Sequence, residues 1–138
     1  MTAETSDDKL SILLVEDDDV FRLVLARSLR ARGYDVQVAA GYEEAVDVAV
    51  ARPPRLALVD LRMPGRSGFD LIEAIKRIHS PTVVVVLSAD RSDASRREAR
   101  KRGAAVYLTK PADIDDIVAT LNHAVENSEK GQARPRVE

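Results

Sequence analysis

The sequence of 138 residues contains no cysteine and no tryptophan, and aromatic residues make up only 4% of it. Without cysteine the chain forms no disulfide, no thiolate zinc site and no cysteine nucleophile. No apolar run approaches the roughly 20 residues that a membrane-spanning helix needs. The opening segment MTAETSDDK is polar and acidic, unlike a secretory signal. These absences predict a cytoplasmic protein with no membrane partner.

Charge of neither sign is in excess, because 21 Lys and Arg oppose 23 Asp and Glu, for a formal net charge of -2. The overall charge therefore gives no reason to expect binding to nucleic acid or to a membrane surface. The length suits one domain with a substantial hydrophobic core and is short for two.

Short stretches rich in β-branched residues recur at 11–16, 35–40, 55–60, 82–89 and 105–110. Each has the length of a strand, and the first, third and fourth are almost continuously apolar, as in strands covered on both faces. Apolar residues at helical spacing occur near 21–29, 45–49, 71–78 and 114–121. The strict alternation predicts an α/β fold, with a five-stranded parallel sheet and helices on both of its faces.

The last predicted helix has a recognisable start, with Asp113 as its N-cap and Asp116 in its first turn. Residues 1–8 and 128–138 are polar and lack periodicity, so both are predicted to be flexible ends. The predicted domain spans residues 9–127, and the second end is either a tail or the stub of a linker.

Polar side chains gather where the predicted strands end. The first strand runs into Glu16, Asp17, Asp18 and Asp19, the third ends at Asp60, the fourth at Ser88, and the fifth at Lys110, which Pro111 follows. Ligands bind at the carboxyl ends of the strands in open parallel sheets, so these residues are expected to share one rim.

The residue types at this rim suit phosphoryl transfer. Carboxylates brought close together repel one another and need a neutralising cation. A cluster of oxygen donors without His or Cys suits a hard ion such as Mg²⁺, and a lysine with a serine suits an anion rich in oxygens. A metal, a lysine and a carboxylate nucleophile are the groups needed to transfer a phosphoryl group onto an aspartate.

Four segments in order carry a resemblance to a known family: LLVEDD (13–18), LVDLRMPGRSGFDLI (58–72), VLSAD (86–90) and GAAVYLTKPAD (103–113). Over roughly residues 9–127 the chain resembles the receiver (CheY-like) domain of bacterial two-component response regulators. The resemblance implies a flavodoxin-like, doubly wound sheet with strand order 2-1-3-4-5.

The resemblance also implies a role for each residue of the rim. Asp60 corresponds to the phosphoacceptor. Asp17 corresponds to a direct Mg²⁺ ligand, Glu16 to an acid that acts mainly through water, and Arg62 to the residue whose backbone carbonyl binds the metal. Ser88 and Tyr107 match the switch hydroxyl and the switch aromatic. Lys110 matches the invariant lysine, whose bond to Pro111 is cis in the family.

As a function, the resemblance implies a signalling switch that accepts a phosphoryl group from the phosphohistidine of a sensor histidine kinase or a phosphotransfer protein. Ser88 is expected to swing towards the phosphoryl group, and Tyr107 then to rotate inward. That movement would remodel the face formed by the helix within 91–102, the strand at 105–110 and the last helix.

The chain is expected not to be an enzyme, beyond weak self-phosphorylation from small donors and autodephosphorylation. Arg62 and Asp90 are expected to flank the path of the attacking water and to tune the phosphoryl lifetime. A homodimer could form on phosphorylation. The chain could be a stand-alone regulator or the receiver half of a larger transcription factor, and DNA would be bound only through an effector domain outside this chain.

Some residues have simpler explanations. At least one of Asp18 and Asp19 is expected to cap a helix, and Tyr107 could be an ordinary core aromatic. The basic segment 91–102 is either a solvated face or a patch that binds an acidic partner or the DNA backbone. Its helix has few apolar anchors beyond Ala94 and Ala99, so it is expected to be short or mobile.

Three other classes of protein compete with the phosphoacceptor hypothesis. A phosphatase of the haloacid-dehalogenase type needs a second aspartate where this chain has Arg62. A nucleotide-binding domain needs a glycine loop where the first strand leads into EDDD. The presence of all five key residues disfavours a degenerate receiver that serves only as a scaffold, an alternative that only experiment excludes.

Overall fold

The computed structural model describes residues 9–63 and 65–133. The strands are β1 (Ser11–Val15), β2 (Asp35–Ala39), β3 (Leu56–Val59), β4 (Val83–Ser88) and β5 (Val106–Thr109). The helices are α2 (Asp19–Ala31), α3 (Tyr42–Ala51), α4 (Gly68–Ile78), α5 (Asp93–Arg102) and α6 (Ile114–Ala133). The predicted flexible end at 1–8, and residues 134–138 of the other, lie outside the described residues.

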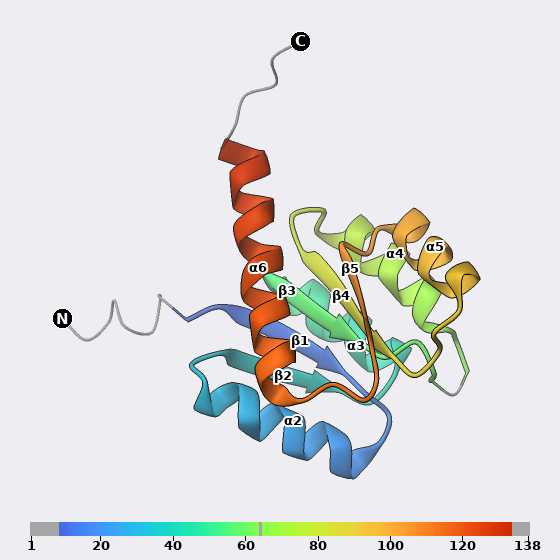
Figure 1. Ribbon diagram of the computed structural model, residues 1–138, viewed down its shortest axis with the longest axis horizontal. Coiled ribbons are helices and arrows are strands. Elements are labelled where there is room, and N and C mark those ends of the chain that lie inside the picture. Colours follow the sequence, from blue (N-terminus) through green and yellow to red (C-terminus); the bar gives the residue numbers. More distant parts are fainter. Residues whose placement is uncertain (1–8, 64, 134–138) are drawn as a thin grey trace, which may run out of the picture.

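The strands form one parallel sheet in the order β2-β1-β3-β4-β5, which confirms the predicted fold class and strand order. Helices α2 and α6 cover one face, and α3, α4 and α5 cover the other (Figure 1). Because strand side chains alternate in direction, Ile12 and Leu14 pack under α2 and α6, whereas Leu13 and Val15 face α3 and α4. This two-sided burial explains the continuous apolar runs of the central strands.

Each observed strand ends one residue before its predicted end, so the polar residues that follow β1, β3 and β5 lie just outside the ladder. Their backbones still bond to the neighbouring strand. Glu16 donates its N–H to the carbonyl of Ala39 (3.1 Å), Asp60 to that of Val15 (3.0 Å), and Lys110 to that of Ser88 (2.8 Å). The sheet therefore fixes the backbone at the start of each side chain of the rim.

The helix expected within 91–102 is α5, whose ten residues equal α3 in length, and these two are the shortest of the described helices. The attachments of α5 include polar contacts. Ser92 caps the helix by accepting from the N–H of Ser95 (3.1 Å), and Arg102 joins it to α4 through ion pairs with Asp70 (3.1 Å) and Glu73 (3.6 Å). A search for apolar anchors could not detect this mode of attachment.

Helix α6 begins as predicted, because Asp113 accepts from the N–H of Asp116 (2.9 Å). It runs to Ala133, six residues past the predicted domain end at 127, so residues 128–133 are helical rather than irregular. An ion pair between Glu129 and Arg55 (2.7 Å) ties this extension to the start of β3. Within 9–63 and 65–133, no helix has the length and apolar composition needed to cross a membrane.

Gly68, the first residue of α4, lies directly against the backbone that carries Asp60. A Cβ atom at this position would come within 2.6 Å of Leu61 Cα and 2.9 Å of the Asp60 carbonyl oxygen. Its N–H donates to the carbonyl of Leu61 (3.1 Å). The absence of a side chain lets α4 approach the end of β3.

We expect Gly68→Ala to lower the free energy of unfolding by about 1–3 kcal/mol, because the added methyl group must displace backbone. The matched control is Gly41→Ala, where no atom lies within 4 Å of the added Cβ, and we expect a change below about 1 kcal/mol there. Urea unfolding of both variants measures the difference. Equal losses in the two variants would contradict the close-approach explanation.

Candidate functional site

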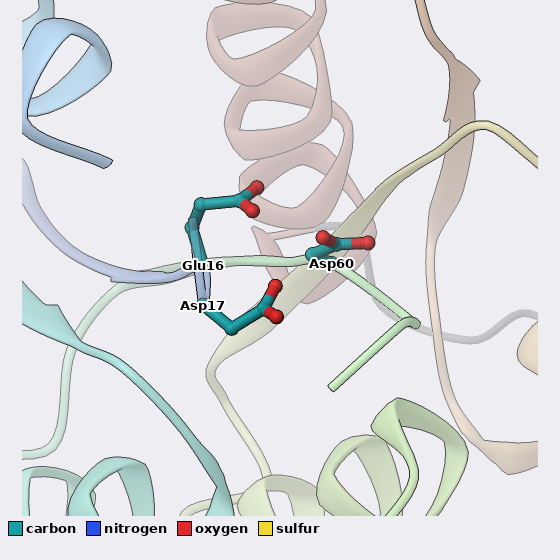
Figure 2. A group of neighbouring side chains, drawn as sticks. All are labelled: Glu16, Asp17 and Asp60. Carbon is teal, nitrogen blue, oxygen red and sulfur yellow. The ribbon is translucent and has the colours of Figure 1, made fainter. Parts of the chain in front are cut away.

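Three carboxylates meet at the carboxyl edge of the sheet (Figure 2). Glu16 and Asp17 follow β1, Asp60 follows β3, and one oxygen from each lies within 4.8 Å of the others. Glu16 and Asp60 are 3% and 6% exposed, whereas Asp17 is exposed to solvent. The structure thus brings the three predicted acidic residues together, with two of them buried and one exposed.

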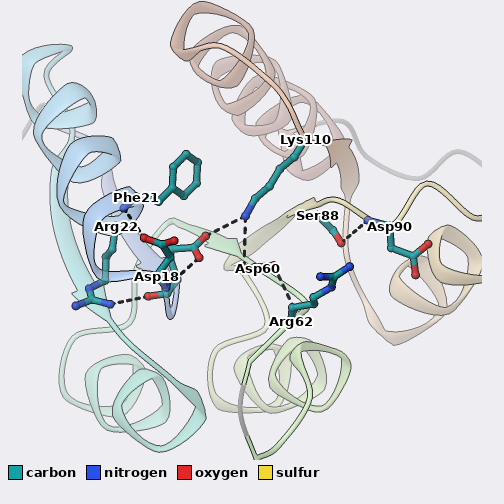
Figure 3. A network of polar contacts seen from close by, with 9 residues as sticks. Asp18, Phe21, Arg22, Asp60, Arg62, Ser88, Asp90 and Lys110 are labelled. Carbon is teal, nitrogen blue, oxygen red and sulfur yellow. Dashed lines mark hydrogen bonds and ion pairs between the residues drawn. The ribbon is translucent and has the colours of Figure 1, made fainter.

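Lys110 reaches these acids from the end of β5 (Figure 3). Its Nζ lies 3.3 Å from Glu16 Oε1 and 3.5 Å from Asp60 Oδ2. The same ammonium lies 4.7 Å from the centre of the Phe21 ring, so an aromatic face covers one of its sides. The bond from Lys110 to Pro111 is cis, as the family resemblance implies.

Glu16 is the acid of the cluster whose pKa is raised by its surroundings. Burial and the neighbouring Asp60 charge raise its pKa from 4.5 to about 7, against the lowering effects of the Asp18 N–H and of Lys110. A raised carboxyl pKa means that the ionised form is held at a cost. A cation bound among the three acids would remove that cost.

The loop from β1 to α2 holds Glu16 and Asp17 in place. Asp18 caps α2 by accepting from the N–H of Phe21 (2.9 Å), which settles which of the two acids serves as the cap. The Asp18 N–H donates to Glu16 Oε2 (3.2 Å). Arg22 donates to the Glu16 carbonyl (2.8 Å) and pairs with Asp19 (2.7 Å).

Arg62 and Ser88 complete the rim. The backbone N–H of Arg62 donates to Asp60 Oδ1 (3.1 Å), and Ser88, fully buried, accepts from the N–H of Asp90 (3.1 Å) through its hydroxyl (Figure 3). A cavity of about 450 Å³ opens at the rim. Its lining residues are Glu16, Asp17, Asp18, Phe21, Asp60, Arg62, Ala89 and Lys110.

Tyr107, the predicted switch aromatic, lies in the interior between β5 and α5. It is 8% exposed, its hydroxyl donates to the carbonyl of Asp90 (2.6 Å), and it contacts the hydroxyl of Ser95 at 2.9 Å. The rotation of Tyr107 on phosphorylation stays a prediction, and in this structure the ring lies in the interior. The hydrogen bonds of its hydroxyl group hold it there.

Sequence reasoning missed three residues near the site: Phe21, Arg22 and Ser95. Phe21 and Arg22 lie one turn into the helix that follows the acidic run, where a side chain can reach back to the rim. Ser95 lies four residues before Ala99, on the buried side of α5. A serine at the core-facing position of a helix was the available signal.

The donors present fit a hard divalent cation, because Glu16, Asp17 and Asp60 offer only oxygen atoms and share one open cavity. Lys110 adds a point positive charge on the opposite side of Asp60 from Arg62. The arrangement can therefore hold a cation and an oxygen-rich anion next to the same carboxylate.

Comparison with known proteins gives the family. Residues 12–122 match the response regulator receiver domain, and the chain belongs to this family. It is 44% identical over 111 residues to the acid tolerance regulatory protein ActR of Rhizobium meliloti. The matched region covers 80% of this chain and 57% of ActR. The chain is 38% identical over 111 residues to the photosynthetic apparatus regulatory protein RegA of Rhodovulum sulfidophilum, covering 80% of this chain and 61% of RegA. The chain thus spans about three fifths of the length of these relatives.

Solved structures agree with this membership. A response regulator of Burkholderia pseudomallei, crystallised with a phosphorylated aspartic acid, a calcium ion and citrate, superposes with a TM-score of 0.79 at 35% identity, over 95% of this chain and 78% of that one. A CheY-like receiver domain from Methanospirillum hungatei gives 0.85 at 23% identity, over 90% of this chain and 99% of that one, and shows the shared fold.

The raised pKa of Glu16 predicts a pH-dependent loss of stability in the absence of metal. Between about pH 4.5 and 7 the folded chain keeps a proton that the unfolded chain releases, so stability falls as the pH rises through this window. Relative to Glu16→Gln, which cannot titrate, we expect the parent to lose up to about 3 kcal/mol. Urea unfolding of both proteins in the presence of a chelator, at pH 5 and pH 7.5, measures their free energies of unfolding. If the gap between parent and Glu16→Gln is the same at both pH values, the prediction is wrong.

Proposed function

We propose that this chain is the phosphoacceptor switch of a two-component phosphorelay. Asp60 takes a phosphoryl group from the phosphohistidine of a sensor histidine kinase or a phosphotransfer protein, with Mg²⁺ as the cofactor. The observation that carries the proposal is the convergence of three carboxylates within 4.8 Å, with Lys110 next to two of them. The relative from Burkholderia pseudomallei supports it, because that protein carries a phosphorylated aspartic acid and a calcium ion.

Each group of the rim has a part in the transfer. An Asp60 oxygen attacks phosphorus, the P–N bond breaks, and its electron pair leaves with the imidazole of the donor. Lys110 offers its ammonium to the oxygens of the phosphoryl group. Bound Mg²⁺ would supply the remaining positive charge, held by Asp17, Asp60 and the Arg62 carbonyl, with Glu16 acting through water.

The response to phosphorylation starts at Ser88. Its hydroxyl now accepts from the Asp90 N–H, and we propose that it turns to donate to the phosphoryl oxygens instead. The loop between β4 and α5 then loses a restraint, which changes the face formed by α5, β5 and α6. The chain needs no enzymatic activity for this, beyond weak self-phosphorylation and autodephosphorylation.

The output lies beyond the receiver domain. The chain spans about three fifths of regulators such as ActR and RegA, and we propose that a cytoplasmic effector domain, outside this chain, contacts DNA. Homodimer formation on phosphorylation would connect the state of the receiver domain to DNA binding by the effector domain. The chain's own charge, -2, gives it no general affinity for the DNA backbone.

The direct test is intact mass after incubation with Mg²⁺ and acetyl phosphate. We expect the parent to gain the mass of one phosphoryl group, and Asp60→Ala to gain none. Asp19→Ala is the matched control, because Asp19 is an exposed acid outside the cluster, and it should be modified like the parent. Chelation of the metal should abolish the gain. An unmodified parent, or equal modification of Asp60→Ala, would favour a scaffold role.

A second test concerns the lifetime of the phosphoryl group. Arg62 lines the cavity, and its positive charge helps to lower the pKa of Asp90, after the larger effect of hydrogen bonds from Ser92. We expect Arg62→Ala and Asp90→Ala each to change the rate of dephosphorylation several-fold while leaving Mg²⁺ affinity nearly unchanged. Decay of the phosphorylated mass with time gives the rate, and parental decay in both variants would remove this role.

A further inference from the structure

A chain of hydrogen bonds links the switch hydroxyl to the buried side of α5. Ser88 accepts from the Asp90 N–H (3.1 Å), the Asp90 carbonyl accepts from the Tyr107 hydroxyl (2.6 Å), and this hydroxyl contacts Ser95 Oγ (2.9 Å). The links come from β4, the loop after it, β5 and α5. They form a continuous path from the rim to the α5–β5 interface.

The direction of the last bond follows from the number of protons. A tyrosine hydroxyl has a single proton, and Tyr107 uses it on the carbonyl of Asp90. In its contact with Ser95 the tyrosine oxygen is therefore the acceptor, and the serine donates. Ser95 is 7% exposed, so this bond is shielded from competing water.

A third contact covers the ring itself. The Arg96 guanidinium carbon lies 5.0 Å from the centre of the Tyr107 ring, within the range of a cation–π interaction. None of the three contacts involves Asp60, Glu16, Asp17 or Lys110. These contacts hold Tyr107 in place without any direct contact to the acids or the lysine of the rim.

We propose that Ser95 is a positioning residue that holds Tyr107 inside the α5–β5 interface both before and after the phosphoryl group is bound. This inference rests on the proposed phosphoacceptor function. In this chain, phosphorylation then changes the hydrogen bond between Ser88 and Asp90, whereas Tyr107 keeps its inward position. Removal of the Ser95 hydroxyl frees Tyr107 and makes its position depend on the state of Asp60.

The three tyrosines of the chain allow a direct test. Uniform 3-fluorotyrosine labelling gives one ¹⁹F signal for each, and Tyr107→Phe identifies the one from Tyr107. A soluble paramagnetic chelate broadens signals from exposed rings. Mg²⁺ with beryllium fluoride serves as the phosphoryl mimic at Asp60.

We expect the parental Tyr107 signal to be protected with and without beryllium fluoride. In Ser95→Ala the loss of one hydrogen bond should shift the equilibrium towards an exposed ring by about fivefold, and beryllium fluoride should restore protection. Ser95→Thr keeps the hydroxyl and should behave as the parent. Ser92→Ala removes the cap of α5 but leaves the Ser95 hydroxyl in place, and it should also keep Tyr107 protected.

Three results would overturn the proposal: a parental Tyr107 that becomes protected only with beryllium fluoride, a Ser95→Ala ring that stays protected without it, or equal exposure in Ser92→Ala and Ser95→Ala. Failure of the phosphoacceptor function would look different. In that case the parent would show no ¹⁹F signal from bound beryllium fluoride, whatever the tyrosine signals do.

Discussion

The mutual repulsion of Glu16, Asp17 and Asp60 is the constraint on which the rest of this molecule depends. One oxygen from each lies within 4.8 Å of the others, two of the acids are buried, and the nearby ammonium of Lys110 offsets only part of their charge. The sheet imposes this closeness, because its ladder holds the backbones at 16, 60 and 110. The burial energy of the core thus maintains a cluster of acids that favours a bound cation.

The hydrogen-bonded loop after β4 connects the charged rim to helix α5 on the surface. Ser88 belongs both to the rim and to this loop, through its bond to the Asp90 N–H. Asp90 in turn joins the loop to Tyr107, and Tyr107 packs under α5. Helix α5 is joined to its neighbours by polar contacts of Ser95 and Arg102 as well as by the buried side chain of Ala99.

The strands and the residues at the rim could be predicted from the sequence because each depends on a local pattern: β-branched runs for the strands, and acids or a lysine at their ends. The strand order has no local signal and was predicted only from the family resemblance. Three features were not predictable from local patterns. The contacts that join α5 to its neighbours include those of Ser95 and Arg102, polar residues that apolar periodicity does not reveal. The extension of α6 lacks apolar periodicity, and the inward position of Tyr107 depends on a partner, Ser95, twelve residues away.

The most direct test of the central claim is a crystal structure of the chain grown with Mn²⁺ in place of Mg²⁺, with the ion located by its anomalous scattering. This account predicts one strong peak among the three carboxylates, bonded to Asp17, Asp60 and the backbone carbonyl of Arg62, with Lys110 turned towards the remaining Asp60 oxygen. Crystals of Asp17→Ala should lack the peak. Parental crystals without a peak at this position, or with the ion bound elsewhere and Asp60 uncoordinated, would contradict the account.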